Sequence, residues 1–265
     1  MAQPLTQQII DPHALSEAAR ERLTDELFAA HERIFAGVDR EAFSAYVVCS
    51  PARRTRIQVF RAGDQVVGYA AFHVFECAVA GRRSRVLRAE VGLLPAYRRG
   101  TRFGWFITRE ALRAVLGSPG TPVWGLSCAT NPATYRTIAR HADMVWPHWE
   151  RPTPPHVEHL MGELAAQFGL RPVEERPGVY HVGWRTRQDE AEALGWQQST
   201  HPAARLYVDR NPGYVDGHGL LLLVPVSGLG MVRACLRLLH HALQRRRRRP
   251  SQALAPSMLR EVEGR

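Results

Sequence analysis

The sequence contains no lysine. All 35 residues that are counted together as Lys and Arg are arginine. Chemistry that needs a lysine amine is therefore excluded, including Schiff-base catalysis, pyridoxal phosphate enzymes and P-loops that rely on a lysine. Cysteine is also scarce, and its four positions lie far apart, without the paired spacing of a disulfide framework or a zinc site. These residues are Cys49, Cys77, Cys128 and Cys235. Isolated thiols are typical of a reducing compartment, so the sequence predicts a cytoplasmic protein without a metal.

Long hydrophobic runs are also missing. Residues 1–15 contain neither the basic nor the apolar segment of a signal peptide. The longest apolar stretch, Leu220 to Val232, is interrupted by Pro225 and by glycines and ends before Arg233. It is too short to cross a bilayer, for which about 20 apolar residues are needed. The sequence therefore predicts no membrane span.

The overall composition is that of a folded domain. The chain has 265 residues, of which 45% are hydrophobic and 23% are charged, enough for one large or two small domains. The formal net charge is +10, but the run Arg245 to Arg249 supplies half of it. The surplus on the rest of the chain is ordinary for this length. The charge therefore does not indicate a specific nucleic-acid partner.

Hydrophobic periodicity divides the chain into three parts. Residues 1–15 are expected to form a flexible tail, and residues 16–226 a single α/β domain with an insertion at about 146–203. Residues 227–265 are expected to form an amphipathic helix and an arginine-rich tail. Helices are predicted over 16–35, 41–48, 103–115, 131–142 and 157–168, and strands over 56–60, 65–77, 86–94, 122–128, 178–184, 204–209 and 220–226.

One motif lies where a strand pattern changes to a helical pattern. It reads Ala-Glu-Val-Gly-Leu-Leu-Pro-Ala-Tyr-Arg-Arg-Gly-Thr-Arg-Phe-Gly over residues 89–104. A glycine-containing turn at the start of a helix offers free backbone N–H groups and the positive end of the helix dipole, which together bind phosphate. The segment resembles the strand, turn and helix with which the GNAT superfamily of acyl-CoA-dependent N-acyltransferases binds the pyrophosphate of coenzyme A.

The resemblance implies that acyl-CoA, most simply acetyl-CoA, is the co-substrate. The turn of the family has the form Arg/Gln-x-x-Gly-x-Gly/Ala, and Arg102 stands here where its middle glycine is expected. Gly100 in a shifted turn, or a contact between Arg102 and phosphate, would preserve the site. The alternatives are a degraded site and an ordinary solvated basic loop. The expected contacts in this segment are Val91, Leu93, Leu94, Arg98, Arg99, Gly100, Thr101, Arg102, Phe103 and Gly104.

A second motif, Trp-Gly-Leu-Ser-Cys-Ala-Thr-Asn-Pro-Ala-Thr-Tyr-Arg, covers residues 124–136. It resembles the GNAT strand that splays away from its neighbour, so that pantetheine fits into the wedge between them. Asn131 is expected to cap the following helix and to belong to the cofactor site. In the family, this helix carries a tyrosine that protonates the departing thiolate. Tyr135 is the candidate here, although it lies about one turn early, and a packed helix tyrosine is the alternative.

Glu90 interrupts an apolar strand, where a carboxylate is costly unless it is paired or functional. In GNAT enzymes, a strand carboxylate near this point serves as the general base for the attacking amine, sometimes through water. The alternative is a structural ion pair with Arg88 or with a helix arginine. His73 and Glu76, on the preceding predicted strand, are lesser candidates for the same role.

Two other patterns suggest weaker alternatives. Residues 125–129 superficially resemble the nucleophile elbow of a hydrolase, but no glycine-rich oxyanion loop precedes them. His156, His159 and Glu163 share one face of a predicted helix and have the spacing of metal ligands. The Pro154-Pro155 start of that helix instead favours an ordinary exposed helix.

Together these features predict an α/β fold of GNAT type, with a mixed, mostly antiparallel central sheet, a splayed strand pair and flanking helices. The implied activity is transfer of an acyl group from acyl-CoA to an unidentified amine by direct attack in a ternary complex. Two rival functions remain open. One is a non-catalytic acyl-CoA sensor or partner-binding module. The other is a membrane-surface protein that associates weakly with anionic lipid through Arg245 to Arg249.

Overall fold

The longest strand of the structure is buried on both of its faces. β4 (Gln65–Val79) is rich in Val, Ala and Phe, and its residues 66–74 are all buried. A strand of this composition is stable in the middle of a sheet that is covered by helices on both sides. It pairs antiparallel with β3 (Arg54–Ala62) and with β5 (Arg82–Leu93), and these three strands carry most of the candidate site.

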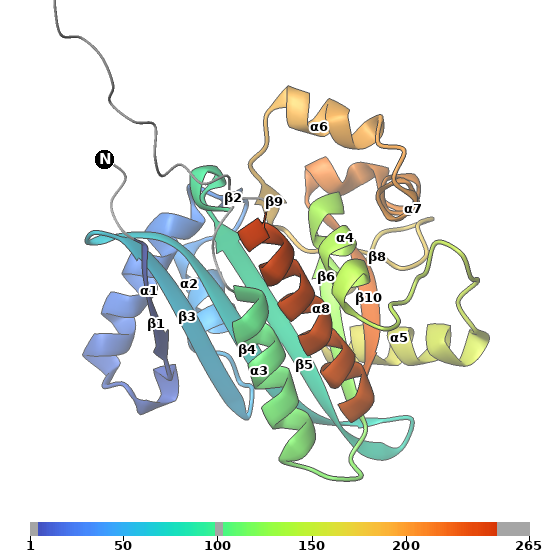
Figure 1. Cartoon of the computed structure of the whole chain (residues 1–265), viewed down its shortest axis with the longest axis horizontal. Helices are drawn as coiled ribbons and strands as arrows, with labels where there is room; N and C mark the ends of the chain where they lie inside the picture. Colours follow the sequence, from blue (N-terminus) through green and yellow to red (C-terminus); the bar gives the residue numbers. More distant parts are fainter. Residues whose placement is uncertain (1–4, 99–102, 248–265) are drawn as a thin grey trace, which may run out of the picture.

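The computed structural model describes residues 5–98 and 103–247, and within these ranges the three strands belong to an eight-stranded sheet (Figure 1). The strand order is β1-β3-β4-β5-β6-β10-β8-β7, and all neighbours are antiparallel except β5 and β6. β2 and β9 pair separately. The remaining strands are β1 (Leu5–Ile10), β2 (Phe35–Ala36), β6 (Val123–Ala129), β7 (Arg171–Pro172), β8 (Val179–His181), β9 (Arg185–Thr186) and β10 (His218–Val226).

Helices cover both faces of the sheet. One face packs against α3, α4, α7 and α8, and the other against α1, α2 and α5, while α6 contacts α7 (Figure 1). α1 and α4 begin after Ser16 and Asn131, whose side-chain oxygens accept backbone N–H groups of the first turn. The helices are α1 (Glu17–His31), α2 (Arg40–Phe43), α3 (Phe103–Leu116), α4 (Pro132–His141), α5 (Pro155–Gln167), α6 (Glu190–Gln197), α7 (Pro202–Arg210) and α8 (Gly228–Arg247).

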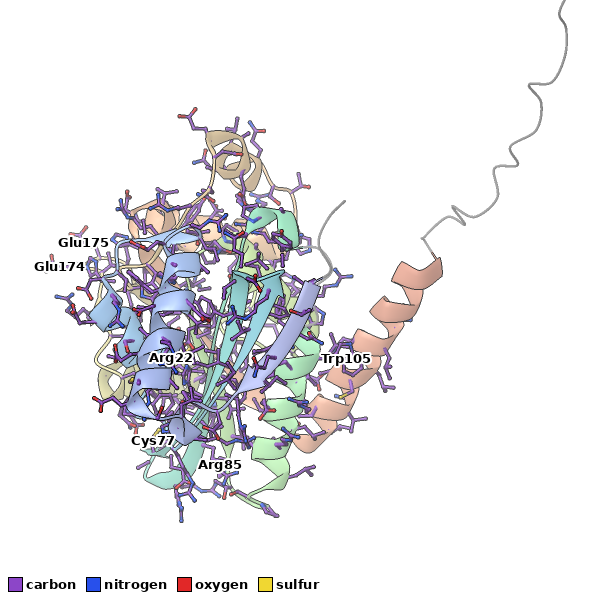
Figure 2. The ribbon with its side chains drawn as sticks, turned by 90° about the vertical axis from the view of Figure 1, so that its left-hand side faces the viewer. Arg22, Cys77, Arg85, Trp105, Glu174 and Glu175 are labelled. Carbon is purple, nitrogen blue, oxygen red and sulfur yellow. The ribbon has the colours of Figure 1, made fainter. Side chains whose placement is uncertain are left out.

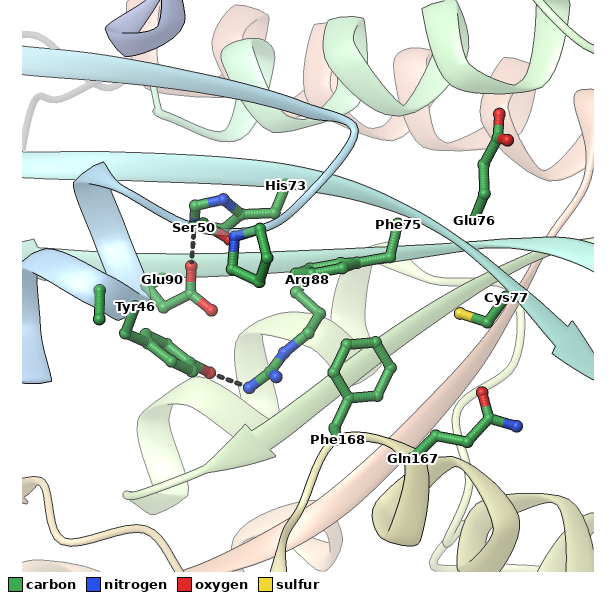
Figure 3. A pocket seen from close by; sticks show the side chains of 12 residues that line it. Tyr46, Ser50, His73, Phe75, Glu76, Cys77, Arg88, Glu90, Gln167 and Phe168 are labelled. Atoms are coloured by element: carbon green, nitrogen blue, oxygen red, sulfur yellow. Dashed lines mark hydrogen bonds and ion pairs between the residues drawn. The ribbon is translucent and has the colours of Figure 1, made fainter.

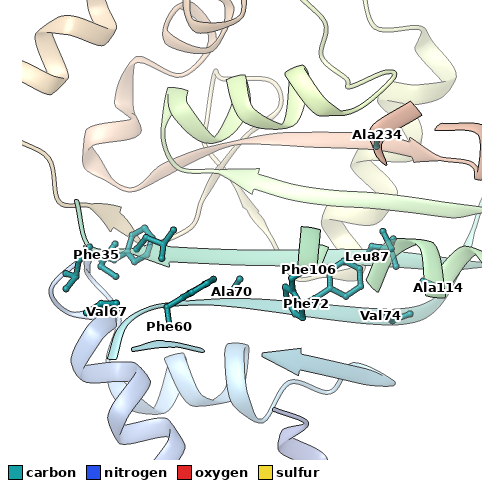
Figure 4. Packing of buried hydrophobic residues seen from close by; sticks show 14 of the residues in the cluster. Phe35, Phe60, Val67, Ala70, Phe72, Val74, Leu87, Phe106, Ala114 and Ala234 are labelled. Atoms are coloured by element: carbon teal, nitrogen blue, oxygen red, sulfur yellow. The ribbon is translucent and has the colours of Figure 1, made fainter. Parts of the chain in front are cut away.

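The core beneath α3 also holds the first turns of α8. Phe72 and Leu87 project from the sheet towards Phe106 of α3, and Met231 and Ala234 of α8 are buried in the same cluster (Figure 4). The helix expected as part of a C-terminal extension therefore packs into the core of the domain. Buried apolar side chains therefore attach the first turns of α8 to the domain, and burial of apolar surface is the dominant stabilising term in folding.

Two segments fold differently from the expectation. Residues 5–10, expected in a flexible tail, form the edge strand β1 in antiparallel register with β3. The side chains of β1 are mostly exposed, so backbone pairing holds the strand and no apolar pattern reveals it. The predicted strand at 204–209 is wrong, because these residues lie in α7. Ala203 and Tyr207, four residues apart, are buried on one face of that helix.

The irregular stretch at 146–203 contributes directly to the sheet. β8 lies within it and pairs with β10, and α5 packs against β4 and β10. Beyond β10 the sheet is therefore completed by β8 and β7, both from this stretch. The mixed, mostly antiparallel sheet between two helical layers confirms the predicted fold class. In the described part of the chain, no helix has the length and apolarity needed to cross a bilayer.

Candidate active site

The parallel neighbours β5 and β6 are paired at one end only. The register joins residues 85–87 of β5 with residues 123–125 of β6. β5 then continues to Leu93 and β6 to Ala129, and no further pairing joins them in the described residues. The two strands therefore splay, as the sequence predicts. The edge of β5 beyond Leu87 faces this wedge without a strand partner, so its backbone groups are available to a ligand.

Three polar side chains stand in a row across the sheet beside this wedge. Thr55 of β3 is directly opposite His73 of β4, and His73 is directly opposite Arg88 of β5. Directly opposed residues share a face of the sheet. Glu90 follows Arg88 by two residues and projects to the same face, because side chains alternate along a strand. The register thus gathers residues from three strands at one place.

His73 connects Thr55 with Glu90. Its Nδ1 lies 3.0 Å from Thr55 Oγ1, and its Nε2 lies 3.0 Å from Glu90 Oε2. His73 is 1% exposed, and the Glu90 side chain is 11% exposed. Nε2 and Oε2 are close without hydrogen-bond alignment, and neither has a hydrogen-bond partner among the described residues. A buried imidazole and carboxylate with unused hydrogen-bonding capacity are suited to accept a proton from a bound amine.

Glu90 and Glu76 differ in their partners. The structural alternative for Glu90, an ion pair with Arg88 or a helix arginine, is not formed within the described ranges. Glu76 forms an ion pair with Arg83 at 2.8 Å and another with Arg53 at 3.3 Å. The hydrogen bond from Arg83, together with the charge of Arg53, lowers the pKa of Glu76. Glu76 is therefore occupied by arginines, whereas Glu90 faces the imidazole.

Arg88 is a buried cation in the same place. It is only 7% exposed, and its guanidinium carbon lies 4.8 Å from the centre of the Tyr46 ring and 4.9 Å from that of Phe168. The guanidinium also donates a hydrogen bond to the Tyr46 hydroxyl. Burial lowers the pKa of Arg88, and the nearby negative charge of Glu90 opposes this effect. In the part of the chain that the structure describes, no carboxylate oxygen lies within 4.0 Å of this guanidinium.

An open cavity of about 470 Å³ is lined by Tyr46, His73, Arg88, Glu90 and Phe168 (Figure 3). Its other walls come from the segment after α2, including Ser50, and from the end of α5, including Gln167. Phe75 and Phe168 meet edge to face, with ring centres 4.9 Å apart, and form an apolar wall. Apolar walls with a few convergent polar groups are typical of a small-molecule site.

Tyr135 lies outside this cavity. It is fully buried in the core between α4, α7 and β10, and its hydroxyl donates a hydrogen bond to the Pro147 carbonyl at 2.8 Å. Burial raises the pKa of Tyr135 well above its ordinary value. These contacts are those of a packed helix tyrosine, which was the alternative to a proton donor. Its role as an acid stays a prediction that these contacts do not support.

The segment expected to bind acyl-CoA is only partly described. Arg99 to Arg102, including Gly100 and Thr101, lie outside the described residues. Leu93 and Leu94 are buried, Val91 and Phe103 pack at the edge of the same core, and Gly104 lies near the start of α3. Arg98 forms an ion pair with Glu192 at 3.3 Å. The geometry therefore keeps the edge of β5 and the start of α3 next to each other, as phosphate binding needs.

Asn131 is the cap that the sequence predicts. Its Oδ1 accepts the Thr134 N–H at 2.8 Å, and its amide donates to Thr186 Oγ1 at 3.1 Å. The first contact satisfies a free donor of the first turn of α4. The second ties the end of β6 to β9.

α8 lies between α3 and α4 on the face of the sheet opposite the cavity (Figure 1). Leu238 approaches the first turn of α3, since a Cβ atom added to Gly104 would lie 3.4 Å from Leu238 Cδ2. Arg233 and Arg237 form ion pairs with Asp143, which follows α4, at 3.3 and 2.6 Å. α8 is thus fixed to both neighbouring helices, and it lies beside the first turn of α3.

The helix with possible metal ligands makes a structural contact instead. The Glu163 carboxylate accepts the backbone N–H of Ala80 at 3.2 Å and thereby joins α5 to the turn after β4. Within residues 5–98 and 103–247, no three His, Cys, Asp or Glu side chains are arranged to hold a metal ion.

The sequence does not predict the surroundings of Arg88. It indicates Arg88 only as a possible partner for Glu90, and it contains no signal for Tyr46 or Phe168. The spacing of Arg88 and Glu90 does place these two residues on one face of a strand. The aromatic rings come from segments 42 residues before and 80 residues after Arg88, and no local pattern predicts that they meet there.

In comparisons with known proteins, the chain is similar to solved structures but to no family model or curated sequence. A conserved protein of unknown function from Enterococcus faecalis, described as a probable N-acyltransferase, has 14% identity and a TM-score of 0.34. That match covers 52% of this chain and 32% of the other, so this chain spans about a third of that protein's length.

Two further structures contain acyl-CoA ligands. NAA60 of Arabidopsis thaliana in complex with acetyl-CoA has 16% identity and a TM-score of 0.36, covering 51% of this chain and 84% of NAA60. The GphF GNAT-like decarboxylase in complex with isobutyryl-CoA has 16% identity and a TM-score of 0.36, covering 83% and 98%. At these values the similarities bear on neither substrate nor mechanism. The GNAT-like fold class follows from the strand order and splayed pair of the chain itself.

Proposed function

We propose that this protein is an N-acyltransferase that moves an acyl group, most simply acetyl, from acyl-CoA to an amine. The observation that carries the proposal is the position of the buried His73 and Glu90 pair beside the splayed end of β5 and β6. The wedge offers unpaired strand backbone to pantetheine, and the pair offers a base to the amine. Both parts of the reaction are therefore provided for at one place in the sheet.

In this proposal acyl-CoA binds along the open edge of β5 and at the start of α3. The residues assigned to it are Val91, Leu93 and Leu94, the turn from Arg98 to Gly104, and Asn131 at the end of β6. The N-terminus of α3 supplies the positive end of a helix dipole for the pyrophosphate. The cavity on the other face of the sheet receives the amine.

The chemistry needs one base and a well-placed nucleophile. Glu90 takes a proton from the acceptor ammonium, and His73, held by Thr55, lies 3.0 Å from the carboxylate that receives it. The neutral nitrogen attacks the thioester carbon, so that the C–N bond forms and the C–S bond breaks with its electron pair on sulfur. The second proton of the nitrogen neutralises the thiolate as the amide forms. The Glu90 proton then returns to solvent.

Thiol release tests the proposed activity directly. With purified full-length protein, acetyl-CoA and a panel of primary amines, we expect free thiol and N-acetylated amine in equal amounts. Acetyl-CoA binding by calorimetry without turnover on any amine would instead support the acyl-CoA sensor. Absence of both binding and turnover would contradict the proposed function and leave the partner-binding module.

A specific observation favours a second role, attachment to an anionic membrane surface through α8. Four large apolar residues at helical spacing face away from the core, namely Leu229, Val232, Leu236 and Leu239, with exposed fractions of 61%, 54%, 59% and 48%. The C-terminal end of α8 leads away from the sheet (Figure 2). The sequence then continues through Arg245 to Arg249. An apolar helix face next to a basic run is complementary to an anionic lipid surface.

Vesicle flotation tests this attachment. Each arginine near an anionic surface contributes about 1 kcal/mol, so truncation after Gln244 is expected to abolish binding to vesicles of phosphatidylcholine and phosphatidylglycerol. The double variant Leu236→Glu and Leu239→Glu is expected to do the same. Acyl transfer should remain intact in the truncated protein. Leu194→Glu, at a 51% exposed position of α6, is the matched control and should still bind. Unchanged binding after both changes on α8 would contradict this role.

A further inference from the structure

We propose that the acceptor amine is an amino acid, whose carboxylate is bound by Arg88 while its amine faces Glu90. This inference rests on the proposed function, because it names the substrate class of the same cavity. It starts from a buried charge without an ion-pair partner. Arg88 is only 7% exposed, and a buried guanidinium is expected to have an anionic partner, yet none of the described carboxylate oxygens lies within 4.0 Å of it.

The contacts of Arg88 hold it ready for such a partner. The rings of Tyr46 and Phe168 lie 4.8 and 4.9 Å from the guanidinium carbon, and the Tyr46 hydroxyl accepts one of its N–H groups. Trp184 packs edge to face against Tyr46, with ring centres 5.3 Å apart, and supports it from outside the cavity. A planar guanidinium fixed between rings keeps further donors for a carboxylate, which it binds through two parallel hydrogen bonds.

The spacing of the two charges selects the kind of amine. Residues two apart on a strand stand about 6.6 Å from each other, because the rise is about 3.3 Å per residue. An α-amino acid has one carbon between its nitrogen and its carboxylate, so both groups can reach their partners at this separation. The charges also match, since the cavity presents a cation and a carboxylate to a zwitterion. An acceptor without an anion would leave Arg88 desolvated and unpaired.

The rest of the cavity accommodates an apolar side chain. Phe75 and Phe168 form one wall, and about 470 Å³ of space is available to the whole ligand. L-phenylalanine is therefore a suitable probe. Phenethylamine is the same molecule without the carboxylate. Phosphoethanolamine carries a phosphate in place of the carboxylate, two bonds further from the nitrogen.

The experiment compares these acceptors with acetyl-CoA in the wild-type protein and in Arg88→Gln. We expect wild-type kcat/KM for L-phenylalanine to exceed that for phenethylamine and for phosphoethanolamine. The ratio of kcat/KM for L-phenylalanine over phenethylamine should fall about 20-fold in Arg88→Gln, which corresponds to loss of a charge-assisted hydrogen-bond pair. Arg88→Lys, which keeps the charge but not the paired donors, should give an intermediate ratio.

Calorimetric binding of L-phenylalanine, in the absence of acyl-CoA, separates failure of this inference from failure of the proposed function. Binding that depends on Arg88 without transfer to any amine would overturn the acyltransferase and retain the amino-acid site. Transfer with equal preference for L-phenylalanine and phenethylamine would overturn the amino-acid site alone. Tyr46→Phe, which removes one contact of the guanidinium, covers the case in which Arg88→Gln does not fold. It should lower the same ratio a few-fold, and an unchanged ratio would count against the inference.

Discussion

Replacing Glu90 with glutamine is expected to lower kcat about 10³-fold, within the range for loss of a positioned general base. The amide keeps the size of the side chain but cannot take a proton from the acceptor ammonium. Because Glu90 projects into the amine cavity, away from the face that carries α3, the affinity for acyl-CoA should remain close to that of the wild type. Steady-state thiol release and calorimetry of acetyl-CoA binding measure the two effects.

A matched control distinguishes a base from a residue that only shapes the cavity. Glu76→Gln changes a carboxylate that lines the same cavity but is paired with Arg83 and Arg53. Its kcat should resemble that of the wild type. A Glu90→Gln protein with more than half of the wild-type kcat would place the base elsewhere, at His73 or at a bound water.

The local pattern of the chain predicts the middle of the fold well and its edges poorly. β4 and the second half of β5 are mostly apolar, and these runs were sufficient to place both strands, although β5 begins at Arg82, before the predicted start at residue 86. β1 has mostly exposed side chains and is held by backbone pairing with β3, and only the folded partner provides this pairing. The segment at 204–209 contains Leu, Tyr and Val, which favour a strand in isolation. In the folded protein these residues form a helix instead, and packing of Tyr207 against the core stabilises it.

The candidate site shows the same division between local and distant information. Glu90 could be singled out because a carboxylate in an apolar strand is unusual. Its relation to His73 depends on the register between β4 and β5, which sets His73 two positions from Glu90 across the pair. The environment of Arg88 depends on the Tyr46 ring, from the segment after α2, and on the Phe168 ring, which follows α5, and both are distant from Arg88 in sequence. The local sequence therefore identified a candidate base, and tertiary packing was needed to identify a cation without an ion-pair partner.

Tyr135 illustrates the limit of carrying a role over by resemblance. Its distance along the helix differed from the family pattern by about one turn, and one turn changes which neighbours a side chain meets. In the structure its hydroxyl is used by the Pro147 carbonyl. The proton for the thiolate is therefore assigned to the attacking nitrogen in the mechanism above.

A change in the first turn of α3 is expected to have the second large effect. Gly104→Leu is expected to weaken acetyl-CoA binding about 30-fold, because a side chain at the helix start prevents close approach of phosphate to two or more backbone N–H groups. Gly104→Ala should have a much smaller effect, since its Cβ atom would meet Leu238 at 3.4 Å, an ordinary contact distance. Calorimetry of acetyl-CoA binding to the three proteins measures this series.

A second substitution, at Leu238, distinguishes the loss of contacts with acetyl-CoA from the effect of overpacking against α8. A leucine at position 104 also crowds α8, and overpacking of this kind costs about 1–3 kcal/mol of stability. Adding Leu238→Ala to Gly104→Leu makes room for the new side chain, so the melting temperature should recover towards that of Leu238→Ala alone. If Gly104 lies against the phosphate, the affinity for acetyl-CoA stays low in this double variant. Recovery of affinity together with stability would show that the single change acted through α8, and would remove Gly104 from the acyl-CoA site.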